Sequence, residues 1–235
     1  MSWKQKSIGI AVLATLVIAV GVNMIDAGAA EKAVIVPAAV LDNPKAAGPL
    51  QTAVLAGGCF WGVQAVYQHV NGVRKSVSGY AGGDKASAHY DIVSSGQTTH
   101  AESVQVTFDP KEISYGQILQ IYFSVVHDPT QLNRQEPDVG PQYRSNIFYA
   151  DDTQKKIAEA YIAQLNKAKV FPKAIVTRVD PMKAFYAAED YHQDFLYLNP
   201  TQPYIARYDM PKLVNLKTVF PVLYRGEPAL VKSSK

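Results

Sequence analysis

Short apolar runs separated by glycines mark the first structural elements of the chain. Residues 52–56 form an apolar run that ends at Gly57 and Gly58, and this predicts a short buried strand. From about Phe60 to Gly72, apolar residues recur at the i, i+3, i+4, i+7 spacing of an amphipathic helix. Residues 73–80 then predict a second strand, followed by a turn at "AGG".

The middle of the chain shows one strand pattern and one helix-start motif. Residues 84–100 have no clear period, so we expect a loop. Residues 102–110 alternate apolar and polar positions, which is typical of a strand with one buried face. Ser114 and Gln117 form a capping box that predicts a helix through about Val126, ended by Asp128-Pro129.

The remaining pattern completes a mixed fold. A long irregular loop is expected over 128–144, a strand over 145–150, a helix over 151–169, a strand over 174–179 and a helix over 185–198. The order β-α-β-β-α-β fits an α+β fold, namely a ferredoxin-like split β-α-β plait with additional helices and a long irregular C-terminal tail.

The N-terminus predicts export. An apolar run from Ile8 to about Met24 follows Lys4 and Lys6, and the small residues of "AGA" come next. Residues 1–30 are therefore expected to be a signal peptide or an uncleaved anchor, with any membrane attachment through residues 8–25 only. Both alternatives place the domain outside the cytoplasm, and in a Gram-negative host that means the periplasm. Residues 31–50 are an Ala/Pro-rich linker or extended arm, 51–222 the main domain and 223–235 a tail.

Composition excludes several classes of function. The net charge is +3 with no block of Lys and Arg, which argues against nucleic-acid binding. No glycine-rich phosphate loop and no metal-ligand spacing is present, so we expect neither cofactor nor metal.

The chain has one cysteine in 235 residues, Cys59, and it cannot form an internal disulfide. A strand that ends in two glycines and leads into a helix places Cys59 at the helix N-terminus, where N–H groups and the helix dipole favour a thiolate. Phe60 and Trp61 could wall an apolar pocket beside it, or simply pack in the core. An inert buried cysteine remains the alternative, but thiol redox chemistry fits the residues best.

Several motifs in the same order resemble the peptide methionine sulfoxide reductase A family, which reduces the S-epimer of methionine sulfoxide. They are "GGCFWG" (57–62), "GYAGG" (79–83), "HYDIVSSGQTTHAESVQV" (89–106), "HDPTQ" (127–131), "DVGPQYRS" (138–145) and "AEDYHQDFLYLNP" (188–200). The resemblance spans roughly residues 51–205 and implies an α/β plait and a catalytic reductase domain over 51–222. It also implies the repair of methionine sulfoxide, free or in exported proteins.

The resemblance also assigns roles at matching positions. Cys59 resembles the nucleophile that attacks the sulfoxide sulfur, and Phe60 and Trp61 resemble the walls that hold the substrate's methyl group. The family's acid matches Glu102. The family has two tyrosines that hydrogen-bond the sulfoxide oxygen, and these match Tyr90 and Tyr143. A further carboxylate of the family's site matches Asp138. An acid here must stay protonated near neutral pH, which requires that burial raise the pKa of Glu102.

The chain departs from most of the family because it has no second cysteine. Ser94 stands where some members have a cysteine, and the tail has none. Attack would leave Cys59 as a sulfenic acid, so an external thiol must regenerate it, either a thioredoxin-like protein or glutathione. Two smaller departures are Thr99, where the family usually has glycine, and Glu136-Pro137, where a glycine-containing sequence is common.

Two other functions stay open from the sequence. One is a one-cysteine thiol peroxidase, in which Cys59 attacks peroxide. The other is a non-enzymatic peptide-binding module, in which Cys59 is structural.

Overall fold

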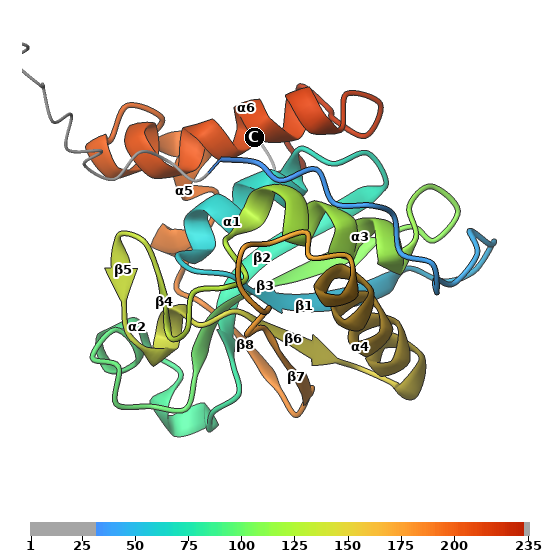
Figure 1. Cartoon of the computed structure of the whole chain (residues 1–235). Helices are drawn as coiled ribbons and strands as arrows, with labels where there is room; N and C mark the ends of the chain where they lie inside the picture. Colours follow the sequence, from blue (N-terminus) through green and yellow to red (C-terminus); the bar gives the residue numbers. More distant parts are fainter. Residues whose placement is uncertain (1–31, 233–235) are drawn as a thin grey trace, which may run out of the picture.

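The fold is built on one six-stranded sheet, seen in a computed structural model that describes residues 32–232 (Figure 1). The predicted signal peptide or anchor, residues 1–30, lies outside the described residues. The sheet has the order β7-β6-β1-β3-β2-β8, in which β6 and β7 run parallel and the other neighbours are antiparallel. Its strands are β1 (Gln51–Ala56), β2 (Val73–Ala81), β3 (Ala101–Phe108), β6 (Asn146–Tyr149), β7 (Arg178–Pro181) and β8 (Phe185–Ala187).

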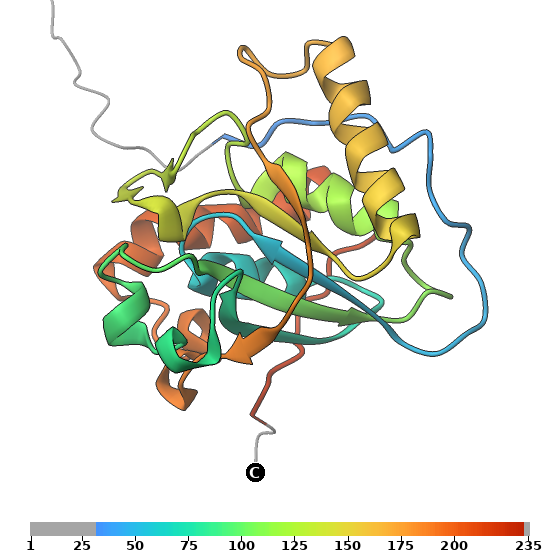
Figure 2. The ribbon, with the colours of Figure 1, turned by 90° about the horizontal axis from the view of Figure 1, so that it is seen from below.

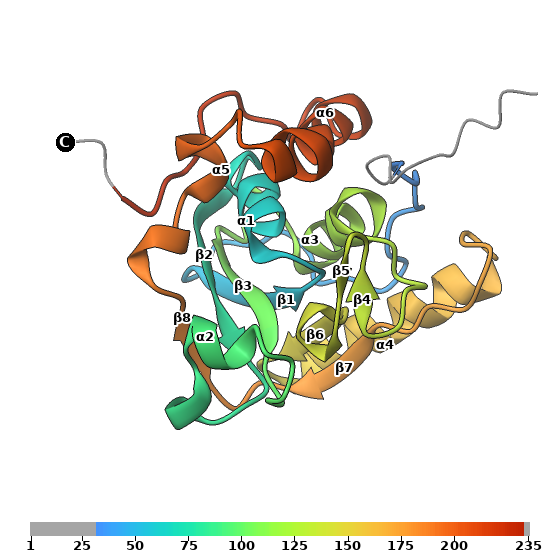
Figure 3. The ribbon, with the colours of Figure 1, turned by 90° about the vertical axis from the view of Figure 1, so that its left-hand side faces the viewer.

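Helices cover the sheet and the loops carry short turns. The longer helices are α1 (Phe60–Gln68), α3 (Tyr115–Ile121), α4 (Asp152–Lys167) and α6 (Met210–Val219). The short elements are η1 (Lys85–Ser87), α2 (Tyr90–Val93), η2 (Tyr122–Val126), β4 (Arg134–Gln135), β5 (Asp138–Val139), η3 (Pro141–Tyr143), η4 (Asp190–His192), α5 (Phe195–Leu198) and η5 (Ile205–Asp209). Helices α1 and α3 lie on one face of the sheet, and α6 packs across α1 from outside (Figures 1 and 3).

The core lies between the sheet and α1 and α3. Leu55 of β1, Val104 and Val106 of β3 and Ile147 of β6 are fully buried, as the alternating pattern of these strands requires. Val66 of α1 is equally inaccessible. On the other face of β1, Val54 and Ala56 are buried in a second cluster with Phe148, so this central strand is covered on both sides.

Several predicted elements are confirmed. Strands at 52–56 and 73–80, the helix from Phe60 and the helix within 151–169 all form. The capping box is also present, because the Ser114 hydroxyl accepts from the Gln117 N–H while the Gln117 side chain accepts from the Ser114 N–H.

The helix predicted over 185–198 is wrong. Phe185–Ala187 form strand β8, which pairs with Gly79–Ala81 at the edge of the sheet. A Cβ added at Gly79 would lie 2.4 Å from Cζ of Phe185, so the glycine leaves the room that the Phe185 ring occupies. Only the short turns η4 and α5 remain helical in this segment.

Three further segments differ from the sequence prediction. The expected loop over 84–100 contains η1 and α2, and the irregular loop over 128–144 contains the β4–β5 ribbon. The strand predicted over 174–179 begins only at Arg178 and continues to Pro181. Helix α6, which follows the last predicted element, had no clear sequence pattern.

The N-terminal segment packs on the domain as an extended arm. Val36 is buried, the Val34 N–H donates to the Ser124 carbonyl at 2.9 Å, and the Tyr161 hydroxyl donates to the Pro37 carbonyl at 2.5 Å. Figure 2 shows the arm passing α4 before the chain enters β1. Among the described residues, no helix is long and apolar enough to cross a membrane.

The C-terminal tail is irregular but is held by hydrogen bonds to α1 and to the loop before α5. The Arg225 N–H donates to the His69 carbonyl at 2.8 Å, and the Ala229 N–H donates to the Gln68 carbonyl at 2.9 Å. Further on, the Lys232 N–H donates to the Asp194 carboxylate at 3.0 Å. The tail therefore covers the C-terminal end of α1, away from Cys59 at its N-terminal end.

Candidate active site

The β1–α1 connection places Cys59 at the N-cap of α1, as predicted. Gly58 has φ +88°, and a Cβ there would lie 2.7 Å from the side chain of Gln135, so only glycine fits without strain. The Tyr122 hydroxyl donates to the Ala56 carbonyl at 2.6 Å and fixes the end of β1. Figure 3 shows this connection with α2 on one side and the β4–β5 ribbon on the other.

The thiol of Cys59 is protonated in the free protein, contrary to the expectation of a favoured thiolate. Burial raises the pKa of Cys59 well above its usual value, and the negative charge of Glu102 raises it further. The Trp61 N–H at the helix N-terminus lowers the pKa of this thiol, but by less. Desolvation therefore outweighs the helix terminus, because Cys59 is only 9% exposed.

Glu102 lies on β3 beside Cys59 and is buried. Its Oε2 accepts a hydrogen bond from the Phe60 N–H at 3.0 Å, which ties the carboxyl group to the first turn of α1. Burial raises the pKa of Glu102 to about 8, with smaller increases from the charges of Asp138 and Asp209, whereas the Phe60 N–H opposes the shift. At neutral pH this carboxyl group is mostly protonated and can donate a proton.

Two tyrosines and one carboxylate reach the site from separate loops. Tyr90 begins α2 and Tyr143 ends η3, and in both burial, followed by the charge of Glu102, raises the pKa of the hydroxyl. Both hydroxyls therefore stay protonated and can act as hydrogen-bond donors at neutral pH. Asp138, on β5, accepts a hydrogen bond from the Tyr204 hydroxyl, and burial raises its pKa.

The two aromatic residues after Cys59 differ in exposure. Phe60 is 1% exposed, and its ring centroid lies 5.9 Å from that of Tyr80 and 5.0 Å from that of His192. Trp61 is half-buried, donates from Nε1 to His192 Nδ1 at 3.1 Å and stacks on Phe195 at 3.9 Å. Trp61 is therefore the aromatic side chain of this pair that a ligand can reach.

Some of the residues in this region were not identified from the sequence. Tyr204 contacts both Trp61 and Asp138. Glu189 accepts from the Tyr80 hydroxyl at 2.8 Å and from the Tyr90 N–H at 2.9 Å, so it anchors the start of α2. Tyr204 and Glu189 are positioned by partners more than 60 residues away in the sequence, so no local spacing indicates them.

The loop that carries Tyr143 is fixed by Arg144. Its guanidinium donates to the carbonyls of Thr99, His100 and Pro141 at 2.8 to 3.0 Å. His100 is fully buried, and its Nε2 lies 3.0 Å from the Asp84 carbonyl. The His100 side chain therefore ties together the two ends of segment 84–100, to which Arg144 also binds.

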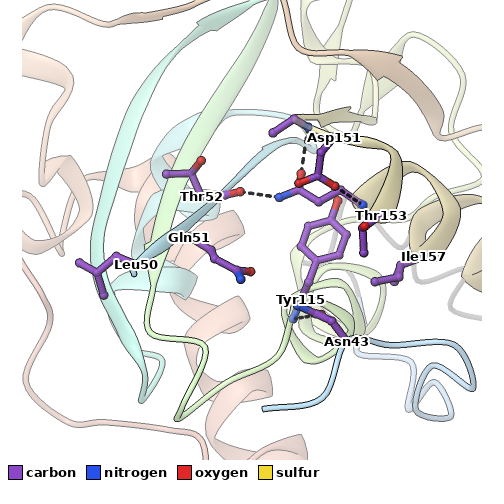
Figure 4. Close-up of a pocket in the computed structure, with 10 residues that line it drawn as sticks. Asn43, Leu50, Gln51, Thr52, Tyr115, Asp151, Thr153 and Ile157 are labelled. Atoms are coloured by element: carbon purple, nitrogen blue, oxygen red, sulfur yellow. Dashed lines mark hydrogen bonds between the residues drawn. The ribbon is translucent and has the colours of Figure 1, made fainter. Parts of the chain in front are cut away.

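Two further features of the described part of the chain concern metal binding and a pocket beside the N-terminal arm. Within residues 32–232, no group of three or more His, Cys, Asp or Glu side chains could hold a metal ion. A pocket of about 370 Å³ between the arm, the start of β1 and the start of α4 is lined by Gln51, Tyr115 and Asp151 among others (Figure 4). None of the predicted site residues lines it.

Comparisons with known proteins agree with one another. A family model described as peptide methionine sulfoxide reductase matches residues 51–220. Peptide methionine sulfoxide reductase MsrA 2 of Mesorhizobium japonicum is 60% identical over 192 residues, which cover 82% of this chain and 98% of that relative. A protein of the same name from Synechocystis is 50% identical over 182 residues, 76% of this chain and 85% of that relative.

Solved structures give the same result. Mxr1 from Saccharomyces cerevisiae in reduced form has a TM-score of 0.60 at 32% identity, covering 69% of this chain and 94% of that one. Methionine sulfoxide reductase A of Corynebacterium diphtheriae has a TM-score of 0.57 at 31% identity, covering 71% and 82%. The chain therefore belongs to the peptide methionine sulfoxide reductase family.

Proposed function

We propose that this protein reduces the S-epimer of methionine sulfoxide, free or in proteins, with Cys59 as nucleophile and Glu102 as acid. The observation that carries the proposal is their juxtaposition: a buried carboxyl group with a pKa of about 8 is hydrogen-bonded to the first turn of the helix that Cys59 caps. A sulfoxide oxygen leaves poorly unless it is protonated while sulfur is attacked, so the two groups are needed together.

The chemical step transfers oxygen from substrate to enzyme. Cys59 Sγ loses its proton and attacks the sulfoxide sulfur, while Glu102 donates a proton to the oxygen. In the resulting intermediate Sγ is bonded to the substrate sulfur, which carries the hydroxyl group. The hydroxyl group then passes to Sγ as the substrate's S–O bond and the new S–S bond break, so methionine leaves and Cys59 is left as a sulfenic acid. The protonated hydroxyls of Tyr90 and Tyr143 would donate hydrogen bonds to the oxygen as it gains charge.

The aromatic residues and Asp138 complete this assignment. Trp61, held by His192 and Phe195, offers an apolar face to the methyl group of the substrate. Phe60 is buried against Tyr80 and His192 and supports the apolar side of the site. Asp138 accepts a hydrogen bond from Tyr204 and orients that tyrosine beside Trp61.

Regeneration of Cys59 needs a thiol from another molecule, because the chain has no second cysteine. One external thiol condenses with the sulfenic acid to give a mixed disulfide and water, and a second thiol releases Cys59 as an external disulfide forms. A thioredoxin-like protein or glutathione supplies thiols of this kind.

The proposal also includes the cellular location, the fold topology and the domain bounds. The apolar run at residues 8–25 supports export, to the periplasm or tethered to the membrane, and hence repair of oxidised exported proteins. The antiparallel order β6-β1-β3-β2, with α1 linking β1 to β2, supports a ferredoxin-like split β-α-β plait. We keep 51–222 as the catalytic domain after a 31–50 linker and before a 223–235 tail.

The test is reduction of separated S- and R-epimers of methionine sulfoxide, with dithiothreitol as reductant. We expect turnover of the S-epimer only, and loss of that turnover in Cys59→Ser. Hydrogen peroxide serves as the competing substrate. Fast peroxide turnover with no sulfoxide reduction would replace the proposal by a one-cysteine thiol peroxidase.

A further inference from the structure

A buried ion pair lies at the junction of η5 and α6, outside the residues assigned above. Asp209 is fully buried, and its Oδ1 lies 3.2 Å from Nζ of Lys212, whose side chain is 9% exposed. Helix α6 crosses α1, so this pair reaches the helix that begins at Cys59 (Figure 1). A buried ion pair is weak evidence for stability, because the desolvation of both charges offsets their attraction.

The side chain of Asp209 does not serve its own helix. Asp209 occupies the N-cap position of α6, where aspartate is among the preferred residues because it accepts from the first N–H groups. Here it makes no capping hydrogen bond. Its Oδ2 is also a buried oxygen without a hydrogen-bond partner among the described residues. The conformation of this side chain therefore needs another reason.

Contact with α1 supplies that reason. A Cβ added at Gly62 would lie 2.1 Å from Asp209 Oδ1 and 3.1 Å from Lys212 Nζ. Gly62 is the third residue of α1, in the turn that Cys59 caps. Glycine is unfavourable inside a helix, and at this position it admits the carboxylate of Asp209 against the helix backbone.

We propose that Asp209, held by Lys212, is a positioning residue of the reductase site whose carboxylate controls the protonation of Glu102 and Cys59. The inference rests on the proposed roles of those two residues and adds to them. Neither Asp209 nor Lys212 is assigned any contact with the substrate.

Electrostatics support the geometric argument. The negative charge of Asp209 contributes to the raised pKa of Cys59 and of Glu102, and it also raises the pKa of Tyr204. Burial raises the pKa of Asp209 itself, and Lys212, whose Nζ lies 3.2 Å from Oδ1, opposes that shift and favours the charged carboxylate. The other titratable groups that face Cys59 and Glu102 are Asp138 on β5, Tyr90 on α2, Tyr143 on η3 and Tyr204 directly before η5.

The test is Asp209→Asn, which keeps the size of the side chain and removes its charge. Two readouts are measured against pH: the rate at which iodoacetamide alkylates Cys59, the only thiol, and kcat/KM for the S-sulfoxide. Without the neighbouring negative charge, both groups lose protons more easily. We expect the apparent pKa of Cys59 and the alkaline limb of kcat/KM to move down by about half to one pH unit. At pH values below the pKa of Cys59 in the parent, where the alkylation rate still rises with pH, alkylation should be about 3- to 10-fold faster in the variant.

The control is Asp152→Asn, which removes an exposed carboxylate at the start of α4 and should leave both profiles unchanged. If Asp209→Asn does not fold, the double variant Asp209→Asn/Lys212→Met replaces the pair by neutral groups. Downward shifts of the same sign but smaller size are then expected, because the loss of the Lys212 charge acts in the opposite direction. Profiles equal to those of the parent, with or without a lower unfolding midpoint, would show a purely structural pair and overturn the inference. Alkylation needs no turnover, so this outcome is separate from any failure of the parent enzyme to reduce sulfoxide.

Discussion

Substituting Glu102 by glutamine removes the acid of the site while keeping its shape. The amide oxygen of glutamine can still accept from the Phe60 N–H, which the Glu102 carboxyl group accepts at 3.0 Å. The amide cannot transfer a proton, and a positioned general acid typically contributes about 10²- to 10⁴-fold to rate. We therefore expect kcat/KM for the S-sulfoxide to fall by that factor, roughly 3 to 5 kcal/mol of transition-state stabilisation.

The pH dependence of activity should change with it. With a pKa of about 8, Glu102 is roughly nine-tenths protonated at pH 7 and about one-tenth protonated at pH 9. The parent enzyme should therefore lose activity on an alkaline limb near pH 8. The residual activity of Glu102→Gln should lack that limb.

The raised pKa of Glu102 also predicts how the free energy of unfolding depends on pH. The pKa of Glu102 rises from 4.5 to about 8 on folding, so between these values the folded protein holds a proton that the unfolded chain has released. The free energy of unfolding of the parent therefore falls by about 1.4 kcal/mol per pH unit in this window, about 5 kcal/mol in all. This stabilisation is fully present below pH 4.5 and is lost as the pH rises to 8.

The assay is urea unfolding of parent and variant at several pH values from 4.5 to 8.5. The difference between the two free energies of unfolding isolates Glu102 from the other titrating groups. We expect that difference to change by about 5 kcal/mol in favour of the variant as pH rises. Glu159→Gln, an exposed change on α4, is the control and should follow the parent. Parallel curves for parent and Glu102→Gln would refute the assignment of a buried, protonated Glu102.

Three further substitutions test the surroundings of Cys59. Gly58→Ala places a Cβ at φ +88° and 2.7 Å from the Gln135 side chain, so its urea midpoint should fall by the equivalent of about 1–3 kcal/mol, whereas Gly48→Ala, with open space around it, should change little. An unchanged midpoint would show that this backbone turn is not strained by a side chain. Tyr90→Phe and Tyr143→Phe each remove one donor to the sulfoxide oxygen, so each should lower kcat/KM about 3- to 10-fold, and equal activity to the parent in both would remove them from the mechanism.

Much of the β1–α1 unit could be predicted from the sequence, because its signals are local. The glycines at 57 and 58 and the apolar spacing from Val63 onward define the strand end, the helix and the position of Cys59. The capping box at Ser114 is local in the same sense. The place of Glu102 at the start of a strand would by itself favour a solvated strand end, and its burial was expected only from the family resemblance of "GQTTHAE"; the side chain is buried.

Other features depend on distant partners and left no local pattern. Phe185 belongs to a strand because Gly79, over a hundred residues earlier, leaves space for its ring, although the spacing over 185–198 favours a helix. Asp209 precedes Met-Pro and has the sequence of an ordinary helix N-cap, whereas its side chain turns to Gly62. The helix terminus at Cys59 was visible in the sequence, but the stronger opposing effect of burial required the packed structure.

The central claim is that Cys59 alone takes the oxygen of the sulfoxide and cannot resolve the product within the chain. The direct measurement is a single turnover without reductant, using one equivalent of methionine S-sulfoxide, followed by dimedone trapping and mass spectrometry of intact protein and peptides. We predict one equivalent of methionine, one dimedone adduct on Cys59, and no adduct in Cys59→Ser. Release of methionine with no adduct and no sulfenic acid on Cys59 would contradict the account.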